Sequence, residues 1–206
     1  MGAIDTVEEV VALRGEQLRI VRPGDVESLI SEEAFEREEL LPYWAELWSS
    51  SVALAEAVAA RSLRGARTLE LGCGLGLPSI AAAAAGGRVV ASDWSPDAVS
   101  ATLANAQLNA VDVEGLVCAW QRPEPLLERG PWDLVLASDV LYERRNAEAL
   151  LELLPRLITP SGEVLVADPD RPPAKGFLES ASQRWEIETR RSPRQSTVSL
   201  HRMRLL

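Results

Sequence analysis

The segment with the clearest capacity for chemistry is the glycine-rich run Glu70-Leu71-Gly72-Cys73-Gly74-Leu75-Gly76, which follows a short apolar stretch. Side chains at such a turn would keep a ligand away from the backbone, and some of these positions are expected to require a positive φ angle. Asp93 ends the next apolar stretch about 20 residues further on, where nucleotide-binding folds place an acid against the ribose hydroxyls. Glycines and acid together predict a nucleoside site; a tight strand-to-helix turn is the plainer explanation for the glycines alone.

The spacing and the charge of this segment indicate which nucleoside is bound. A dinucleotide fingerprint, G-x-G-x-x-G, needs its third glycine at position 77, but this chain has Gly76 followed by Leu77. Glu70 adds a second carboxylate at the loop, and two acids would disfavour a pyrophosphate at the helix N-terminus. A positively charged sulfonium with an amino-acid tail tolerates that charge. The sequence therefore favours S-adenosylmethionine (SAM) over NAD as the cofactor, with S-adenosylhomocysteine as the product.

A second group of candidates ends a later apolar stretch, Ser138-Asp139-Val140-Leu141-Tyr142. The carboxyl ends of strands carry the ligand site in an open α/β sheet, so Asp139 could orient a lysine ammonium or assist its deprotonation. Alternatively, Asp139 caps a helix that begins near Glu143. The segment Asp168–Pro173 is either an acceptor-binding wall or plain turn chemistry. His201, the only histidine, lies in a terminal hairpin, where a structural role is the more common one.

Tryptophan is unusually frequent, with six residues against two tyrosines and two phenylalanines. Those expected at strand ends or ahead of the core are Trp44, Trp48, Trp94 and Trp120. Aromatic faces there would stack on adenine and attract a sulfonium by cation–π forces of about 0.5–2 kcal/mol each. The alternative is that they fill gaps between the N-terminal segment and the sheet. Trp132 and Trp185 are expected in the core.

The elements ahead of the glycine run differ from those after it. Residues 1–64 are expected to form an N-terminal extension that packs on the core and supplies lid and substrate contacts. Val10–Leu13 and Gln17–Val21 predict a hairpin. A helix is expected from Asp25 to about Glu39, and a second from Ser49 or Ser50 to a left-handed cap at Gly65.

Residues 65–206 alternate strands with helices and are expected to form the SAM-binding core, one structural domain overall. The expected strands are Thr68–Leu71, Arg88–Asp93, Glu114–Trp120, Asp133–Ser138 and Gly162–Asp168, and Trp185–Thr189 with Thr197–Leu205 predict a terminal antiparallel hairpin. The expected helices are 78–85, 95–110 with Val99, Leu103, Ala106 and Ala110 on one face, 146–158 and 177–183. Strands apolar on both faces indicate a parallel sheet covered on each side. The predicted fold class is α/β: Rossmann-like, with a mostly parallel seven-stranded sheet.

Composition limits the partners. A length of 206 residues suits one domain, and a net charge of -10 repels a phosphate backbone, so no nucleic acid is expected as a partner. A small molecule or a basic protein segment suits this charge better. Cys73 and Cys118 lack the spacing of a metal site, so no metal is expected. No apolar run reaches membrane-spanning length and no leader opens the chain, so we expect a cytoplasmic protein with no membrane partner.

Taken together, these segments resemble the class I SAM-dependent methyltransferases over nearly the whole chain. LELGCGLG (69–76) is similar to their first motif, ASDWSP (91–96) to the second and WDLVLASDVLYE (132–143) to the fourth-strand motif. Pro42–Trp48 together with Asp139–Tyr142 resembles the seven-β-strand, lysine methyltransferase-like group. That group includes enzymes acting on the electron-transfer-flavoprotein β subunit and on chaperones.

The resemblance implies a role for each matching position. The expected cofactor-binding residues are Trp48, Glu70, Gly72, Cys73, Gly74, Gly76, Asp93, Trp94, Trp120 and Ser138. Asp93 would hold the ribose, Trp94 and Trp120 would flank the adenine, and Asp139 and Tyr142 would face the transferred methyl group as the catalytic pair. Related sequences often carry an acid immediately before the position of Trp120. This chain has Ala119 there, which leaves the adenine amino group to a backbone partner.

The expected reaction is in-line transfer of the SAM methyl group to a nitrogen, with a protein lysine as the favoured acceptor. The protein's main tasks would be alignment of the attack and exclusion of water. One alternative is a methyltransferase acting on nitrogen or oxygen of a small metabolite, and another is a non-catalytic binding subunit with the same fold. Base methylation is disfavoured because Ser138–Tyr142 lacks the Asn/Asp-Pro-Pro-Tyr pattern. The oligomeric state cannot be inferred from the sequence.

Overall fold

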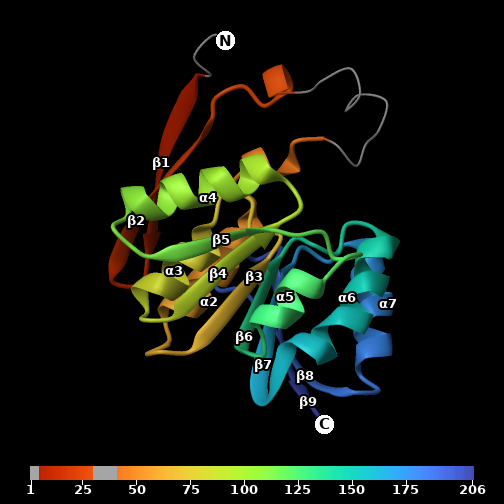
Figure 1. Cartoon of the computed structure of the whole chain (residues 1–206). Helices are drawn as coiled ribbons and strands as arrows, with labels where there is room; N and C mark the ends of the chain where they lie inside the picture. Colours follow the sequence, from red (N-terminus) through yellow and green to blue (C-terminus); the bar gives the residue numbers. More distant parts are fainter. Residues whose placement is uncertain (1–4, 30–40) are drawn as a thin grey trace.

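A seven-stranded sheet in the order β5-β4-β3-β6-β7-β9-β8 organises the chain (Figure 1). The structure is a computed structural model that describes residues 5–29 and 41–206. Its parallel strands are β3 (Arg67–Leu71), β4 (Arg88–Asp93), β5 (Val113–Val117), β6 (Trp132–Ser138) and β7 (Ile158–Asp168). The antiparallel strands β8 (Trp185–Arg191) and β9 (Ser199–Leu205) complete it, with β9 paired to β7 and β8 at the edge.

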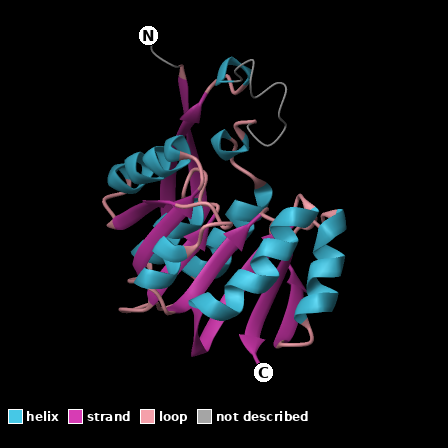
Figure 2. Cartoon of the chain, turned by 45° about the vertical axis from the view of Figure 1, so that its right-hand side comes forward, coloured by secondary structure: helices cyan, strands magenta, loops and turns pink. Residues whose placement is uncertain are grey.

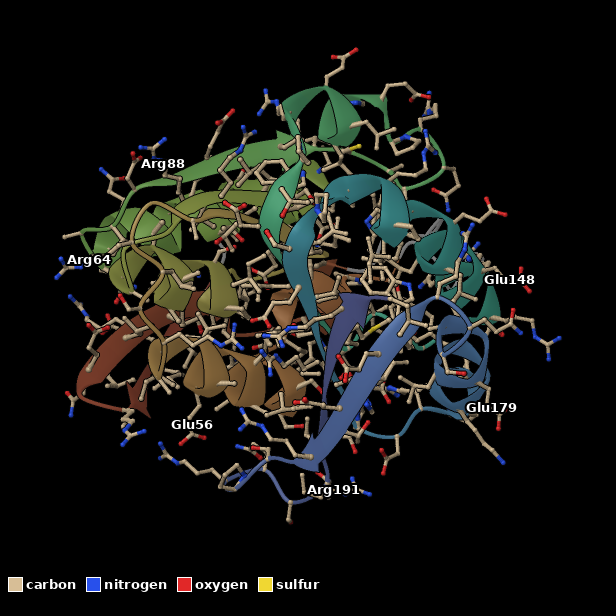
Figure 3. All side chains as sticks on the ribbon, turned by 90° about the horizontal axis from the view of Figure 1, so that it is seen from below. Glu56, Arg64, Arg88, Glu148, Glu179 and Arg191 are labelled. Carbon is tan, nitrogen blue, oxygen red and sulfur yellow. The ribbon has the colours of Figure 1, made fainter. Side chains whose placement is uncertain are left out.

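Helices cover both faces of this sheet (Figure 2). One layer holds α2 (Ser49–Ala59), α3 (Leu77–Ala84) and α4 (Pro96–Leu108), and the other holds α5 (Glu124–Arg129), α6 (Arg144–Leu157) and α7 (Pro172–Ala181). Side chains alternate along a strand, so Leu134 and Leu136 pack with the first layer while Val135 and Ala137 pack with the second. In Figure 3, the labelled Glu56 on α2 and Glu179 on α7 lie on opposite sides of β8 and β9.

The strand order creates a switch point at the carboxyl ends of the central strands β3 and β6. From β3 the chain steps outward through β4 to β5, and then returns to place β6 and β7 on the other side of β3. The helices that follow β3 and β6, α3 and α6, therefore lie on opposite faces of the sheet, and the two connections diverge from the carboxyl ends of these strands. Open α/β sheets bind ligands at such a switch point.

An N-terminal hairpin of β1 (Thr6–Leu13) and β2 (Glu16–Pro23) packs along α4 (Figure 1). Two asparagines one helical turn apart hold it. The Asn105 side chain accepts from the Val21 amide (2.8 Å) and donates to the Val21 carbonyl (3.1 Å), and Asn109 does the same for Arg19 (2.8 and 2.6 Å). Asn105 also donates to the Leu75 carbonyl in the glycine run (3.0 Å). The hairpin is thereby tied to the loop that the sequence singles out.

Several sequence predictions are confirmed by this architecture. The α/β class, the mostly parallel seven-stranded sheet, the terminal antiparallel hairpin and the N-terminal hairpin are all present. Ser95 caps α4 as expected, its side chain accepting from the Ala98 amide. The expected helix from Asp25 falls largely on residues 30–40, outside the described residues; a 3-10 turn at Glu27–Leu29 precedes them. Separation of residues 1–64 from the core stays a prediction.

Other predictions are wrong in their bounds. Helix α2 ends at Ala59, and Gly65 (φ 73°) instead lies in a loop where its amide donates to the Gly86 carbonyl (2.9 Å). Strand β5 stops at Val117, so Trp120 lies in the following loop. The proline pair 172–173 starts α7, because proline at the first helical positions lacks only an amide that would be unpaired anyway.

Helix packing accounts for two further differences. Leu103 (39% exposed) and Ala110 do not join the buried face of α4, which includes Thr102 and Asn105 instead, because the glycine run and β2 supply hydrogen-bonding partners there. The short α5 is absent from the prediction. Among the described residues, no helix is long and apolar enough to cross a membrane.

Candidate active site

A cavity of about 320 Å³ lies at the carboxyl ends of β3, β4 and β6, at the switch point of the sheet. Its walls come from these strand ends, the loop after β5 and the segment 41–51. Ten of the twelve site residues expected from the sequence line it: Trp48, Gly72, Cys73, Gly74, Asp93, Trp94, Trp120, Ser138, Asp139 and Tyr142. Glu70 and Gly76 do not.

The glycine run forms one wall through its backbone. Gly72, Gly74 and Gly76 have φ angles of 68°, 52° and 81°, which confirms the expected left-handed conformations. A Cβ at Gly72 would lie 3.1 Å from Val140 Cγ1, and one at Gly74 would lie 3.3 Å from the Trp44 carbonyl oxygen. The loop therefore presents bare backbone to the cavity and has little room for side chains.

Gly76 has a packing role instead of the expected ligand contact. It precedes α3 as its N-cap, and a Cβ there would lie 2.5 Å from Thr102 Cγ2 on α4. The absence of a side chain lets α4 approach the turn, so that the Thr102 hydroxyl donates to the Gly74 carbonyl (2.9 Å). Gly76 thus supports the glycine run, which forms the cavity wall, without lining the cavity itself.

Glu70 is also placed differently from the prediction. Its side chain is fully buried beneath the turn, where Oε2 accepts from the amide of Ser79 (2.9 Å) and from its hydroxyl. Oε1 has no partner among the described residues. Burial raises the pKa of Glu70 to about 8, so it is mostly neutral at pH 7. The argument that Glu70 adds negative charge to the site is therefore wrong, and Asp93 carries that argument alone.

Asp93 presents a fixed carboxylate at the cavity wall. It is 6% exposed, Oδ2 accepts from the Gly74 amide (3.2 Å) and Oδ1 from the Ser95 amide (3.0 Å). Burial raises the pKa of Asp93, and these amides oppose the rise. The Trp94 amide also interacts with this carboxylate, and a carboxylate offers about four acceptor positions, so acceptor capacity stays available for a ligand. This remaining acceptor capacity suits ribose hydroxyls, which would donate to it.

Two tryptophans flank the same end of the cavity. Trp94 follows Asp93 directly and is 49% exposed, an unusual environment for so large an aromatic side chain. Trp120 reaches in from the loop after β5, with its Cζ2 atom 3.7 Å from where a Gly72 Cβ would stand. Ala119 lines the cavity beside it. Bare backbone, diol acceptor and aromatic walls together fit an adenosine-type cofactor.

Asp139 lines the cavity directly after β6. It is 9% exposed with φ 55°, its Oδ1 accepts from Arg171 Nε (2.9 Å), and its Oδ2 accepts from the Ser50 hydroxyl (3.4 Å). The alternative of a helix cap is wrong, because α6 begins at Arg144 with Glu143 at the cap position. The Asp139 carboxylate is held by side chains from two separate elements and borders the cavity.

Three aromatic residues that contact one another also line the cavity, and the sequence predicted a role for only two of them. The ring centroids of Tyr43 and Tyr142 are 5.8 Å apart, and those of Tyr43 and Trp48 are 6.5 Å apart. Trp48 Nε1 donates to the Tyr43 carbonyl (2.8 Å), which fixes the indole. Burial raises the pKa of Tyr142, so its phenol stays neutral. Tyr43 received no role from the sequence, although it lies in the quoted segment Pro42–Trp48.

The segment Asp168–Pro173 shows the turn chemistry expected of it, and its role as an acceptor-binding wall stays a prediction. Asp168 is fully buried, its Oδ1 accepts from the Arg171 amide (2.7 Å), and burial raises the pKa of its carboxyl to about 6. Arg171 does not line the cavity, but its side chain pairs with Asp139, which does. Asp170 instead accepts from Ser199 (2.9 Å) and pairs with Arg191, which is loop anchoring.

The residues expected to be structural lie away from the cavity. His201 is 3% exposed on β9, and its Nδ1 shares a hydrogen bond of 2.8 Å with Thr189 Oγ1. Burial lowers the pKa of His201, which keeps the ring neutral at pH 7. Trp132 and Trp185 are 2% and 3% exposed, which confirms their core positions.

Comparison with known families decides what this geometry represents. A family model described as "Lysine methyltransferase" matches residues 38–184, most of the chain. The chain belongs to the lysine methyltransferase family. The match includes the glycine run, Asp93, Trp120 and the Asp139–Tyr142 segment, so the predicted resemblance is confirmed over the whole cavity-forming region.

Named relatives agree with this placement. The electron transfer flavoprotein beta subunit lysine methyltransferase of Xenopus laevis is 35% identical over 139 residues, covering 63% of this chain and 53% of the relative. The protein N-lysine methyltransferase METTL21A of Danio rerio is 30% identical over 168 residues, covering 77% and 76%. The histone-arginine methyltransferase METTL23 of Mus musculus is 35% identical over 117 residues, covering 53% and 46%. The chain spans about half the length of most of the curated relatives it matches.

Solved structures show the fold. The Thermus thermophilus 16S rRNA N2 G1207 methyltransferase, in complex with AdoMet and guanosine, has a TM-score of 0.72 at 16% identity, covering 98% of this chain and 51% of that one. A ribosomal protein L11 methylase from Lactobacillus delbrueckii has a TM-score of 0.61 at 21% identity, covering 76% and 78%. The predicted fold is confirmed, and the family match supports the predicted enzyme class, a SAM-dependent methyltransferase, and the predicted cofactor.

Proposed function

We propose that this protein transfers a methyl group from SAM to a nitrogen of a protein, with a lysine side chain as the favoured acceptor. The observation that carries the proposal is one cavity lined by two chemically different groups of residues. Asp93, bare glycine backbone and Trp94 form one group, which we take as the cofactor end, and Asp139 with the aromatic cluster forms the other, which we take as the acceptor end. When bound, SAM supplies a methyl group on a positively charged sulfur that is a good leaving group.

The cofactor end would hold the nucleoside through complementary surfaces. Asp93 accepts hydrogen bonds from the two ribose hydroxyls, and its own orientation is fixed by the Gly74 and Ser95 amides. Trp94 and Trp120 pack on the adenine faces. The left-handed backbone at Gly72 and Gly74 lets main-chain groups approach the amino-acid tail without steric obstruction.

The acceptor end would orient the nucleophile and exclude water. Asp139 Oδ1 or Oδ2 accepts a hydrogen bond from the acceptor nitrogen and can take its proton as the nitrogen becomes nucleophilic. Tyr43, Trp48 and Tyr142 offer apolar faces along which the methylene groups of a lysine pack. Alignment of the nitrogen accounts for most of the expected acceleration, because sulfonium needs little activation.

A protein acceptor is favoured over the two alternatives from the sequence. Several relatives are named for protein lysine or histone arginine, and the net charge of -10 favours a basic segment over a nucleic acid. Two neighbours in fold are rRNA methylases by their titles, but their identities of 16% and 15% carry only the fold. A small-metabolite acceptor and a non-catalytic binding role are the competing functions. We also propose that the protein is cytoplasmic.

Methyl-labelled SAM incubated with a cell lysate and the purified protein tests this function. We expect label in the protein fraction and methyl-lysine after acid hydrolysis. Asp139→Asn should retain SAM binding but lose labelling, whereas Asp112→Asn, an exposed aspartate outside the cavity, should label normally. Label confined to small molecules would reject the protein acceptor, and methyl-arginine alone would reject lysine. Undiminished labelling by Asp139→Asn would remove Asp139 from the mechanism.

A further inference from the structure

The Arg171 side chain already satisfies the groups that an acceptor nitrogen would use. Its Nε donates to Asp139 Oδ1 at 2.9 Å, and its Cζ lies 5.8 Å from the centroid of the Trp48 ring. A carboxylate and an aromatic face are the two features that bind an organic cation most strongly in proteins. The guanidinium of Arg171, the residue directly before α7, thus occupies the position between Asp139 and Trp48.

The backbone and the side chain of Arg171 are held by different partners. The backbone amide donates to Asp168 Oδ1 at 2.7 Å, and the adjacent Asp170 is held by Ser199 and Arg191. The Arg171 side chain is 36% exposed, while that of Asp139 is 7% exposed. The guanidinium can therefore turn toward solvent while the loop stays anchored, and Asp139 cannot follow it.

We propose that Arg171 is a built-in competitor at the acceptor position, a specificity-determining residue that a positively charged acceptor displaces from Asp139 and Trp48. This inference rests on the proposed function, because it takes Asp139 to be the group that receives the acceptor nitrogen. It also explains how the site would select cationic acceptors over uncharged ones, which the cavity shape alone does not.

Charge balance supplies that reason. Beside burial, the Asp139 carboxylate adds to the rise in the pKa of Asp168, and Arg171 interacts with both carboxylates. An incoming ammonium or guanidinium replaces the lost positive charge, so the exchange keeps the Asp139 carboxylate paired. A neutral acceptor would leave a buried carboxylate without its cation, which is costly. Arg171 therefore favours cationic side chains and disfavours uncharged metabolites.

Calorimetric titration of the full chain with n-butylammonium chloride, a mimic of the lysine side-chain end, tests the competition. Arg171→Met removes the competing charge and should bind butylammonium about tenfold more tightly than wild type. Arg171→Lys retains a cation and should stay close to wild type. Adding Asp139→Asn to Arg171→Met should abolish the gain. Arg129→Met, which removes an exposed arginine paired with Glu114, serves as the matched control and should change nothing.

Neutral n-butanol separates charge from space. If Arg171→Met gains affinity equally for butanol and butylammonium, the mutation merely opens volume and the proposal is wrong. Unchanged butylammonium affinity in Arg171→Met would also overturn it. In wild-type protein, nuclear magnetic resonance should show the Arg171 Nε–H exchanging faster with water when butylammonium is added, and unchanged exchange would contradict the displacement. This readout does not depend on a variant folding.

SAM titration of the same samples keeps this inference distinct from the proposed function. Wild-type protein that binds SAM while Arg171→Met shows no gain for butylammonium would overturn only the competitor role. Wild-type protein that fails to bind SAM would overturn the proposed function, whatever the amine result.

Discussion

Replacing Gly76 by alanine tests the assignment of this glycine to packing instead of ligand contact. Gly76 has φ 81°, and alanine in the left-handed region costs about 1–2 kcal/mol. The new Cβ would lie 2.5, 2.7 and 2.9 Å from the Cγ2, Oγ1 and Cβ atoms of Thr102. Because Thr102 Cβ itself is one of these atoms, rotation of the side chain cannot relieve the contact.

The two effects add to a measurable loss of stability. Overpacking a close-packed interior costs about 1–3 kcal/mol, so Gly76→Ala should destabilise the protein by about 2–5 kcal/mol in total. Thr102→Ser removes Cγ2 but retains the hydroxyl that donates to the Gly74 carbonyl. In the Gly76→Ala background this second change should recover about 1 kcal/mol, measured as a coupling energy in a double-mutant cycle.

Equilibrium unfolding in urea provides the assay, with the midpoint expected to fall by about 1–2 M at an unchanged slope. Gly176→Ala is the matched control. Gly176 lies within α7, where an added Cβ meets nothing within 4 Å, so this change should stabilise by about 0.5–1 kcal/mol. A loss below about 1 kcal/mol in Gly76→Ala, or no recovery with Thr102→Ser, would refute the packing assignment.

Three further outcomes follow from the geometry. The pKa of Glu70 is raised from 4.5 to about 8 in the folded protein. The contribution of the protonated Glu70 to the free energy of unfolding is therefore complete below pH 4.5 and is lost as the pH rises to 8. The stability of Glu70→Gln relative to wild type should therefore rise between about pH 5 and 8 and stay constant above pH 8. Urea midpoints of variant and wild type that differ by the same amount at every pH would contradict a buried, protonated carboxyl. Trp94→Ala should weaken SAM binding by about tenfold in calorimetry without lowering the urea midpoint, since the ring is half exposed. Asn105→Ala should cost about 2–3 kcal/mol and speed hydrogen exchange at the Val21 amide, because it removes the side chain that joins Val21 to Leu75; unchanged exchange there would show that β2 is held by other contacts.

Much of the architecture could be predicted because local chemistry agrees with it. The strand Arg88–Asp93 ends at an acid, Ser95 caps the helix that follows the strand, and glycines end the helix that precedes the strand. The hydrophobic pattern and the residues that start and stop helices therefore predict the same boundaries. The short helix α5 gave no such signal. It has six residues and buries only Leu126, too little for a periodic pattern to register.

The site was predictable where one segment supplies the chemistry and unpredictable where distant segments combine. Asp93 and the glycine run are read directly from their order along the chain. The role of Gly76 depends on Thr102 on another helix, and the neutrality of Glu70 depends on burial, which no local pattern reports. The contact between Arg171 and Asp139 joins residues 32 positions apart. It could have been suspected only from the positions of both residues at the carboxyl ends of adjacent strands.

Calorimetric titration with SAM, carried out on the wild-type protein and on Asp93→Ala, tests the central claim most directly. Loss of the two hydrogen bonds to the ribose should weaken a micromolar affinity by about a hundredfold. Asp97→Ala, which removes an exposed acid in the first turn of α4, should bind as wild type does. Equal SAM affinity in Asp93→Ala, or a wild-type protein that binds NAD and not SAM, would contradict the account.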